Sequence, residues 1–406
     1  MRAVVLTNLY PPHHYGGYEL LCQDTVTGWR AAGHDVTVAC SDHRVAGVAD
    51  GDEPDVERTL KFYWRDFQLL RPAPRERFAM ERSNHLRWTN ILDRVQPDVV
   101  SVWNYGMFGY PVLAEVVRRA IPLVLVIGDL WPCWGPSFDR WTTMFTRGPT
   151  RRLAGRLVER FTGIATTLPD LGAHSIVLPA SEWLRGRLER DSPFHFERLE
   201  VIPHGFSTRD FPILDPRDRA EDPFGWRLLL PGRLDDRKGW RTAVRALESL
   251  PNATLTLAGG GEAREVAAVR AVAEAVGAGD RVEHVVVERV EMSALYRAAD
   301  VVLFPSEWNE PFGIVGLEAM ACAVPVVATG TGGSGEYLTH ESNCLLFEKG
   351  DPEALAVAVR RLAADAALRQ RLVDAGHATA EAYRAETTVR ALEERHVAAS
   401  LEGRGR

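Results

Sequence analysis

Residues 3–40 read AVVLTNLYPPHHYGGYELLCQDTVTGWRAAGHDVTVAC, and the fold prediction starts from the pattern in this segment. An apolar run at 3–7 predicts a buried strand, Gly16-Gly17 predicts a turn, and residues 19–32 predict a helix. A second apolar run at 36–40 predicts the next strand. This order of elements is typical of a parallel α/β sheet.

The same alternation continues through most of the chain. Further short apolar runs predict strands at residues 97–102, 122–127, 175–178, 227–230, 253–258, 281–287, 301–304 and 325–328. Between the two series, residues 208–226 are rich in Asp, Arg, Pro and Gly, including Asp218, Asp222 and Pro223, and predict a linker. We therefore expect two doubly wound parallel-sheet domains, at 1–210 and 211–384, and a helix at about 385–406 that packs back on the first domain.

Composition restricts the class of protein. The chain has 406 residues, 46% of them hydrophobic, and a net charge of −7, so we expect a globular protein that does not bind nucleic acid. No signal peptide and no long apolar segment is evident, which favours a cytoplasmic location. The five cysteines are scattered, which predicts buried thiols rather than disulfides or a zinc site.

The segment Gly-Arg-Leu-Asp-Asp-Arg-Lys-Gly at 232–239 follows a predicted strand and precedes a predicted helix. Such junctions bind anionic ligands in open α/β sheets. Gly232 opens the segment, and Arg233 and Lys238 are suited to hold a diphosphate. The chain has only two other lysines, Lys61 and Lys349, so a lysine here indicates a need for an ammonium group. The alternative is a solvated turn with ordinary surface charges.

Two carboxylates flank the next predicted strand-to-helix junction. Glu310 lies in the loop and Glu318 on the helix, with seven residues between them. Glu310 is suited to accept hydrogen bonds from sugar hydroxyls and Glu318 from the two ribose hydroxyls, while the backbone N–H groups near Phe312, Gly313, Ile314 and Val315 would face a phosphate. The alternative is a helix-terminal charge and a surface residue.

Together these segments resemble the family 4 retaining glycosyltransferases, the glycosyl transferases group 1. The segments that carry the resemblance are YPPHHYGGYE at 10–19, VIPHGF at 201–206, the Gly-Arg-x4-Lys-Gly element, PSEWNEPFGIVGLEAMACAVPVVAT at 305–329 and GGSGE at 332–336. The resemblance covers almost the whole chain and implies the GT-B fold, with two Rossmann-like domains facing a central cleft. It also implies a donor in the C-terminal half and an acceptor in the N-terminal half.

The resemblance further implies roles for individual residues. Arg233 and Lys238 would contact the diphosphate of a nucleoside-diphosphate sugar, Glu310 the transferred sugar and Glu318 the ribose, while Gly16-Gly17 would contact the donor phosphate or the acceptor. We predict that the two cations and the helix-terminal amides stabilise the leaving diphosphate. Asp129 is our candidate for orienting the acceptor or the sugar, with a structural helix cap as the alternative.

By the same resemblance, the acceptor hydroxyl attacks with retention of configuration. We expect neither a metal ion nor a cofactor other than the sugar-nucleotide co-substrate. The acceptor is expected to be a glycan, a glycolipid or a small natural product. The alternatives are another enzyme of the same fold, such as an epimerase or a phosphorylase, and a catalytically silent sugar-nucleotide binding protein.

Two positions depart from the family pattern. Where the family often has His-Asp after the fourth strand, this chain has Gly128-Asp129, so the histidine that commonly touches the donor sugar is missing. His13, His14 and Asn104 are the candidates to replace it. The usual Pro-Asn-Gly is Pro203-His204-Gly205, a milder change because Asn and His both tolerate a left-handed backbone.

A competing motif lies at 330–335, where Gly-Thr-Gly-Gly-Ser-Gly matches the dinucleotide-binding fingerprint. It is not followed by a crossover helix that leads to an acidic residue at a strand end about 20 positions later, so the context argues against hydride transfer.

Two further features concern the first domain. The aromatic cluster of Trp103, Trp131, Trp134 and Trp141 with Phe138 and Phe145 is suited to stacking on a sugar or an apolar ring, with core packing as the alternative. The segment Arg147–Arg160 has the pattern of a basic amphipathic helix, which leaves open a contact with the inner membrane surface or a phosphorylated acceptor; a solvated helix face is the alternative.

Overall fold

The computed structural model describes residues 1–51, 53–65, 68–216 and 224–404. The chain divides into two compact units: unit 1 comprises Met1–Pro203 and Thr388–Arg406, and unit 2 comprises His204–Thr387. Asp218, Asp222 and Pro223 of the predicted linker lie outside the described residues.

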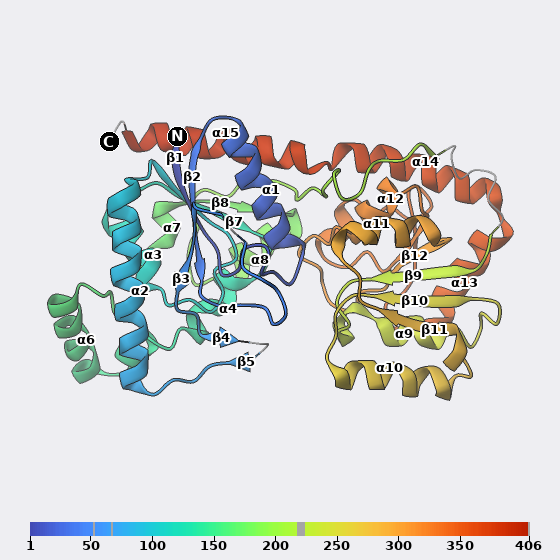
Figure 1. Cartoon of the computed structure of the whole chain (residues 1–406), viewed down its shortest axis with the longest axis horizontal. Helices are drawn as coiled ribbons and strands as arrows, with labels where there is room; N and C mark the ends of the chain where they lie inside the picture. The colour runs from blue at the N-terminus through green and yellow to red at the C-terminus, as the bar shows by residue number, and fades with distance from the viewer. Residues whose placement is uncertain (52, 66–67, 217–223, 405–406) are drawn as a thin grey trace. The chain divides into compact units, whose positions relative to one another are not determined.

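Unit 1 is built on a parallel six-stranded sheet with the order β3-β2-β1-β6-β7-β8 (Figure 1). Its strands are β1 (Arg2–Leu6), β2 (Asp35–Ser41), β3 (Val56–Leu60), β6 (Val99–Val102), β7 (Leu123–Ile127) and β8 (Ser175–Pro179). A two-stranded antiparallel ribbon pairs β4 (Trp64–Arg65) with β5 (Gln68–Leu69). The strands β6, β7 and β8 are buried along their whole length, as is usual for parallel strands that helices cover on both faces.

The helices of unit 1 connect these strands. They are α1 (Gly17–Ala31), α2 (Pro74–Val95), α3 (Pro111–Arg118), α4 (Trp131–Phe138), α5 (Thr143–Thr146), α6 (Pro149–Thr162), α7 (Leu171–His174) and α8 (Glu182–Asp191). The C-terminal helix α15 (Ala385–Arg404) also packs here from Thr388 onward. The ring of His396 on this helix lies 4.5 Å from the Trp29 ring of α1, and its Nε2 is 2.8 Å from Ser101 Oγ.

Unit 2 repeats the same topology with the order β11-β10-β9-β12-β13-β14. Its strands are β9 (Arg227–Pro231), β10 (Thr254–Ala258), β11 (Val282–Val285), β12 (Val301–Phe304), β13 (Val326–Ala328) and β14 (Leu345–Leu346). Its helices are α9 (Trp240–Ala246), α10 (Ala263–Ala275), α11 (Arg289–Ala298), α12 (Val315–Ala321), α13 (Pro352–Ala364) and α14 (Ala366–Ala382). Short 3-10 turns occur at η2 (Asp236–Lys238), η3 (Gly279–Arg281) and η4 (Gly333–Glu336). Figure 1 shows α9 and α10 on one face of this sheet and α11 and α12 on the other.

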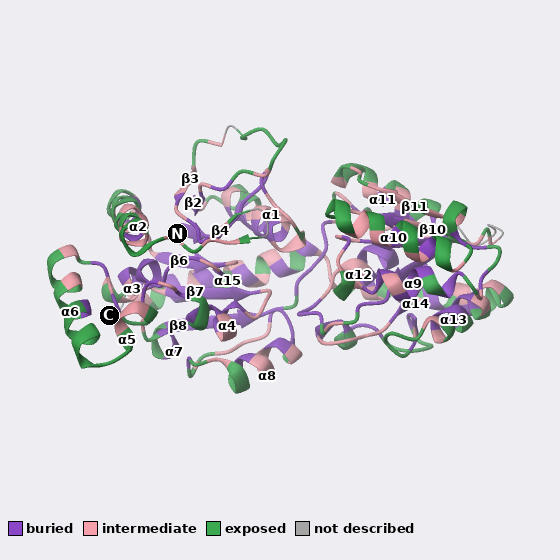
Figure 2. Cartoon of the chain, turned by 90° about the horizontal axis from the view of Figure 1, so that it is seen from below, coloured by how far each residue is buried: buried purple, intermediate pink, exposed green. Residues whose placement is uncertain are grey.

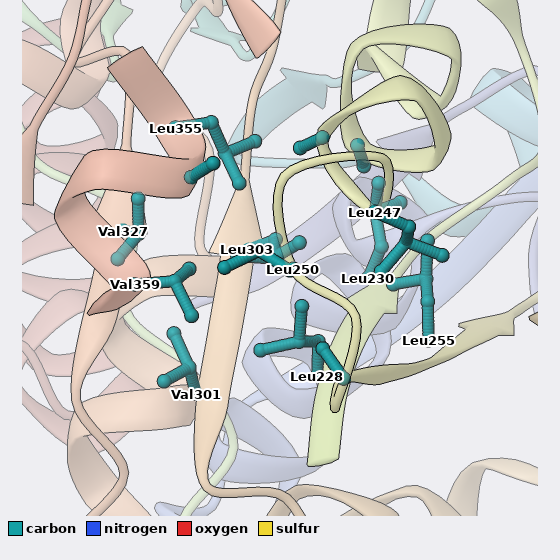
Figure 3. Packing of buried hydrophobic residues seen from close by; sticks show 14 of the residues in the cluster. Leu228, Leu230, Leu247, Leu250, Leu255, Val301, Leu303, Val327, Leu355 and Val359 are labelled. Carbon is teal, nitrogen blue, oxygen red and sulfur yellow. The ribbon is translucent and has the colours of Figure 1, made fainter. Parts of the chain in front are cut away.

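One hydrophobic core cluster of unit 2 lies on the face covered by α9, α10 and α13. Figure 3 shows Val301, Leu303 and Val327 of the sheet packed against Leu355 and Val359 of α13. Each of these side chains is inaccessible to solvent. Because such burial is worth about 1.5–3 kcal/mol per large aliphatic side chain, this cluster fixes the sheet that carries the charged loops described below.

The predicted fold class is confirmed in both units. Each predicted strand is present to within two residues at each end, and the predicted 19–32 helix is α1, which begins at Gly17. The sequence prediction missed β3, an edge strand whose first four residues are only partly buried, because its side chains are too polar to read as an apolar run. Asp210 and Phe211, within the predicted linker, are anchored in unit 2: Arg289 donates to Asp210 at 2.8 Å, and the Phe211 and Tyr296 rings are 5.2 Å apart.

Candidate functional site

The charged loops of unit 2 follow two neighbouring strands. The segment 232–239 comes directly after β9, and Glu310 lies in the loop after β12. These two strands pair in parallel, with Val301 opposite Leu228, so both loops leave the same edge of the sheet. The two motifs therefore lie on neighbouring strands at the same edge of the sheet.

Close packing and hydrogen bonds hold the backbones of the two loops together. Gly239 has φ +73°, and a Cβ at this position would lie 1.9 Å from the carbonyl oxygen of Pro305. Glu307 N donates to Arg237 O at 2.8 Å, and Thr242 Oγ1 donates to Glu307 Oε1 at 2.5 Å. Only glycine fits at 239, because the left-handed conformation and the close approach both exclude a side chain.

Lys238 and Glu310 form an ion pair at the centre of this arrangement. Lys238 Nζ lies 2.8 Å from Glu310 Oε1, and Ser306 Oγ donates to the same oxygen at 2.5 Å. Glu310 is only 3% exposed, whereas the Lys238 side chain is 28% exposed. The Trp308 ring lies 5.7 Å from Lys238 Nζ and 5.0 Å from the Arg237 guanidinium carbon, within cation–π range. A partly exposed lysine is thus held beside a buried carboxylate.

The glycine-rich loop at 330–335 supports the backbone of Glu310. Gly333 N donates to Glu310 O at 2.7 Å, and a Cβ on Gly332 would lie 2.4 Å from that same oxygen. The loop leads into η4, a four-residue 3-10 turn, and not into a crossover helix. The match to a dinucleotide fingerprint is therefore explained by close backbone packing.

Arg233 belongs to a second charged group in the first loop. Asp235 Oδ2 lies 3.3 Å from an Arg233 amino nitrogen and 2.7 Å from one of Arg237. Hydrogen bonds from Arg237 hold the pKa of Asp235 well below its usual range, so this carboxylate is charged at neutral pH. Asp235 also accepts from Arg237 N at 2.9 Å and fixes the turn. Gly232 opens the loop at φ +119°.

Glu318 is held from two sides on α12. Tyr296 Oη donates to Glu318 Oε2 at 2.7 Å, and an Arg289 amino nitrogen lies 3.4 Å from Glu318 Oε1. Burial raises the pKa of Glu318, while Arg289 acts in the opposite direction. Arg289 also pairs with Asp210, so Glu318 belongs to a buried network of hydrogen bonds.

The four residues predicted to face a phosphate, 312–315, have different structural roles. Phe312 is buried, with ring centroids 5.5 Å from Tyr337 and 5.8 Å from Tyr383. Gly313 has φ +81° and accepts a short hydrogen bond from Tyr337 Oη. Ile314 is the N-cap of α12 and Val315 is its first residue. The His204 ring lies 6.2 Å from Phe312, and burial lowers the pKa of His204 to about 4, so it is neutral at pH 7.

Unit 1 presents a different set of groups at the ends of its strands. Gly16 is the N-cap of α1 with φ −162°, and Gly17 begins the helix. Glu19 Oε2 accepts from Gly16 N at 3.1 Å, and Asn104 Nδ2 donates to Glu19 Oε1 at 3.3 Å. Burial raises the pKa of Glu19 to about 7. Glu19 was not predicted from the sequence, although a glutamate three residues after an N-cap is the mark of a capping box.

Asp129 lies just after β7, the strand next to β6, which leads to Asn104. Its Oδ1 accepts from the backbone N of Trp131, the first residue of α4, at 2.8 Å, while Leu130 is the N-cap of that helix. Burial raises the pKa of Asp129 to about 6, and its charge contributes to the raised pKa of Glu19. The two carboxyl groups therefore interact electrostatically.

The structure bears on two of the alternatives that the sequence left open in the first domain. Trp103, Trp131 and Trp141 are at most 1% exposed, so core packing accounts for them and stacking on a ligand does not. His13, one candidate for the missing histidine, lies 2.7 Å from Asp50 and accepts from Val45 N, which commits both ring nitrogens to local structure. Phe138 remains 45% exposed.

Metal clusters and membrane spans are both absent from the described ranges. Within 1–51, 53–65, 68–216 and 224–404, no group of three or more His, Cys, Asp or Glu side chains is arranged to hold a metal ion. No helix in the same ranges has the length and apolar character that a membrane span requires. The five cysteines are free thiols; four are buried as predicted, whereas Cys133 is only partly buried.

Comparison with known proteins agrees with this geometry. Residues 15–210 match the family described as Glycosyltransferase Family 4, and residues 216–379 match Glycosyl transferases group 1. A glycogen synthase of Mycobacterium tuberculosis is 32% identical over 393 residues, 91% of this chain and 88% of that protein. The chain belongs to the family 4, group 1 glycosyltransferases, and its two parallel-sheet units have the GT-B fold.

Other relatives differ in how much they share. A D-inositol 3-phosphate glycosyltransferase of Xylanimonas cellulosilytica is 37% identical over 201 residues, which is 46% of this chain and 48% of that protein. The match thus spans about half the length of that relative. The crystal structure of HepE from Anabaena in complex with UDP-glucose is similar in fold, with a TM-score of 0.68 and 21% identity over 97% of this chain and 98% of HepE.

Proposed function

We propose that this glycosyltransferase moves a hexose-type sugar from a nucleoside-diphosphate sugar to a hydroxyl-bearing acceptor, with retention of configuration and without a metal ion or further cofactor. The observation that carries the proposal is the Lys238–Glu310 pair, 2.8 Å apart, between two locked loops. A cation for the diphosphate and a buried carboxylate for sugar hydroxyls lie side by side, as a sugar diphosphate requires.

The donor proposal assigns one chemical task to each charged group of unit 2. Lys238 and Arg233 neutralise the diphosphate, and their charge is worth most when the leaving group departs, because negative charge then builds up on its oxygens. Glu310 orients the sugar, and Glu318 accepts from ribose hydroxyls. HepE, which shares the fold, was crystallised with UDP-glucose, which supports a nucleotide-sugar donor without identifying the base or sugar used here.

The acceptor proposal places Gly16, Gly17 and Asp129 in unit 1. Asp129, with its pKa raised to about 6, is suited to orient an acceptor hydroxyl, and Glu19 holds the glycine turn in place. The relatives include enzymes named for inositol phosphate and for glycogen, so the acceptor class proposed here is a polyol, a glycan, a glycolipid or a small natural product.

The first experiment is thermal denaturation with UDP, GDP, ADP and dTDP and their sugar conjugates, because a ligand of the native state raises Tm by mass action. We expect one nucleoside diphosphate to stabilise the protein. Glu310→Ala should keep that stabilisation and lose transfer by roughly 100-fold or more, whereas Lys238→Ala and Glu318→Ala should weaken nucleotide binding itself.

The matched control for Lys238→Ala is Lys349→Ala, because Lys349 is exposed in the same unit and lies outside the two charged loops. Full transfer activity in all three site variants would refute the assignment. Conversion of the donor without any acceptor would indicate an epimerase, and donor binding without turnover would indicate a silent binding protein. Stabilisation by NAD or NADP alone would refute the donor proposal.

A further inference from the structure

Helix α6 presents an exposed apolar stripe. Leu153, Leu157 and Phe161 follow one another at intervals of four residues, and they are 58%, 48% and 79% exposed. Figure 2 shows the helix almost entirely in the exposed class. A side chain as large as Phe161 with four-fifths of its surface in water is unusual enough to require an explanation.

The packing of α6 against the rest of unit 1 explains why this stripe faces outward. Gly155 is its one buried residue, and a Cβ there would lie 2.9 Å from Thr166 Oγ1 and 3.0 Å from Phe145 Cβ. Residues two positions away point to roughly the opposite side of a helix, at 100° per residue. Leu153 and Leu157 therefore point away from the surface on which Gly155 rests.

Arginines border the apolar stripe. Arg152, Arg156 and Arg160 have the same four-residue spacing, one position before each apolar residue, and Arg147 and Arg151 lie on the N-terminal side. All five are exposed, and no acidic side chain in the described part of the chain forms an ion pair with any of them. This segment has a formal charge of +4 in a protein whose net charge is −7.

The single acid of the helix does not neutralise this surface. Glu159 accepts hydrogen bonds from Thr166 N and Thr166 Oγ1, both at 3.3 Å, on the side where Gly155 is seated. The ends of the helix are also fixed, by Pro149 in its first turn and by Gly163 at φ +73°. The stripe is thus a preformed feature of a capped helix.

We propose that α6 is a docking surface for a bilayer rich in anionic phospholipid. An apolar stripe bordered by arginines is the pattern of a helix that lies in the interface plane, with its apolar side chains at the acyl boundary and its cations among phosphates. An acidic protein or a nucleic acid would pair with the arginines but would leave Leu153, Leu157 and Phe161 exposed. This proposal does not depend on the proposed donor or acceptor.

The test is flotation of the whole chain with vesicles of phosphatidylcholine alone and of phosphatidylcholine with phosphatidylglycerol. We expect binding to the anionic vesicles, weakened by salt, and little binding to the neutral ones. Leu157→Ser/Phe161→Ser should reduce the partition coefficient by more than about tenfold. Arg152→Gln/Arg156→Gln/Arg160→Gln should reduce it by roughly 100-fold, whereas the corresponding Arg→Lys triple should retain it.

Two variants serve as matched controls in unit 1. Leu401→Ser removes another apolar side chain that is 60% exposed, and Arg185→Gln/Arg187→Gln/Arg190→Gln removes three arginines from α8. Both should leave partitioning unchanged. The α6 and Leu401 variants should melt within a few degrees of the wild type, because their substituted side chains are exposed. The melting temperature of the α8 triple variant is measured as well, because Arg185 and Arg187 are only partly exposed and form ion pairs.

Three results would overturn the proposal. The first is failure of the wild type to bind anionic vesicles, and the second is binding that the α6 variants do not change. The third is self-association in solution that the Leu157→Ser/Phe161→Ser variant abolishes, without vesicle binding, which would make α6 an interface between copies of the chain.

Discussion

The sheets of the two units have the same strand order, but the acidic side chains of the two units have different surroundings. Unit 1 buries acids whose pKa values lie above the usual range: about 7 for Glu19 and about 6 for Asp129 near strand ends, and about 8 for Glu81 on α2. Unit 2 keeps its charges in pairs, such as Lys238 with Glu310. The shared topology fixes where the loops emerge, and the loop residues alone determine what each unit can bind.

The difference has a simple physical cause. A buried carboxyl without a close cation loses hydration, so its neutral form is favoured, whereas a carboxyl beside a cation keeps its charge. Unit 1 follows the first rule at Glu81, where burial and the nearby Asp139 both raise the pKa and Tyr63 Oη donates at 2.6 Å. Unit 2 follows the second rule at Asp235, whose pKa is lowered by hydrogen bonds from Arg237.

The largest expected effect tests the neutral acids of unit 1. Because burial raises the pKa of Glu81 to about 8, the folded state holds its proton more tightly than the unfolded chain does. Its contribution to stability is complete below about pH 4.5 and is lost as the pH rises toward 8, a change of roughly 4–5 kcal/mol at 1.36 kcal/mol per pH unit. Glu81→Gln should remove this pH dependence, since Gln is neutral and still accepts from Tyr63.

The measurement is the free energy of unfolding of the wild type and of Glu81→Gln at pH 5 and at pH 8. Hydrogen exchange of the backbone amides in β1 and β6 shows whether the change in stability lies in unit 1. Relative to the wild type, the Glu81→Gln variant should be more stable at pH 8 than at pH 5. Glu182→Gln, at a half-exposed glutamate, is the control and should show no such gain. A difference between wild type and variant that stays constant with pH would mean that Glu81 is charged when folded.

The next effect tests the locked loops of unit 2. Gly239→Ala places a Cβ against Pro305 O and holds the alanine backbone in the left-handed conformation. We therefore expect the free energy of unfolding to fall by about 3 kcal/mol or more and nucleotide binding to weaken. Gly277→Ala is the matched control, because Gly277 has φ +66° but a Cβ added there would meet no atom of the described residues within 4 Å. It should cost only about 1 kcal/mol. Equal losses in urea unfolding would show that contact with Pro305 is unimportant.

A smaller effect concerns Glu318, the buried acid of unit 2 that most resembles those of unit 1. Tyr296→Phe removes the hydrogen bond to Glu318 Oε2, which should cost about 1–2 kcal/mol and weaken nucleotide binding severalfold. Tyr383→Phe, at a partly buried tyrosine of the same unit, is the control. Isothermal titration with the stabilising nucleotide provides the measurement. Unchanged affinity with reduced stability would limit Tyr296 to a structural role.

The smallest effect on stability is expected at Gly16. Its backbone is extended, and a Cβ would lie 3.6 Å from Glu19 Oε2, which is an ordinary contact. Gly16→Ala should therefore change the free energy of unfolding by no more than about 0.5 kcal/mol. If Gly16 approaches a ligand as proposed, transfer should nevertheless fall. An active Gly16→Ala variant would exclude close approach at this position.

The sequence alone predicted most of the fold, because buried parallel strands are short apolar runs between breakers. It failed at β3, where an edge strand keeps polar side chains, and at β14, which has only two residues. The two unit 2 motifs could be located from the sequence because glycines, cations and acids follow predicted strands there, and their roles in donor binding stay predictions. The sequence left open whether the tryptophans stack on a ligand or pack in the core, because composition does not show on which side of a strand end a ring lies. The structure shows core packing for Trp103, Trp131 and Trp141.

The order of elements, the family and the charged residues of the 232–239 and 310–318 segments were determined by the sequence itself. Local patterns are sufficient for these because periodicity and turn chemistry act over a few residues. Only the tertiary structure decided that Lys238 pairs with Glu310, that Gly239 rests on Pro305 and that Glu19 is buried beside Asn104. Each of these joins residues from different strands or loops, and their burial and pKa values depend on the packing that brings them together.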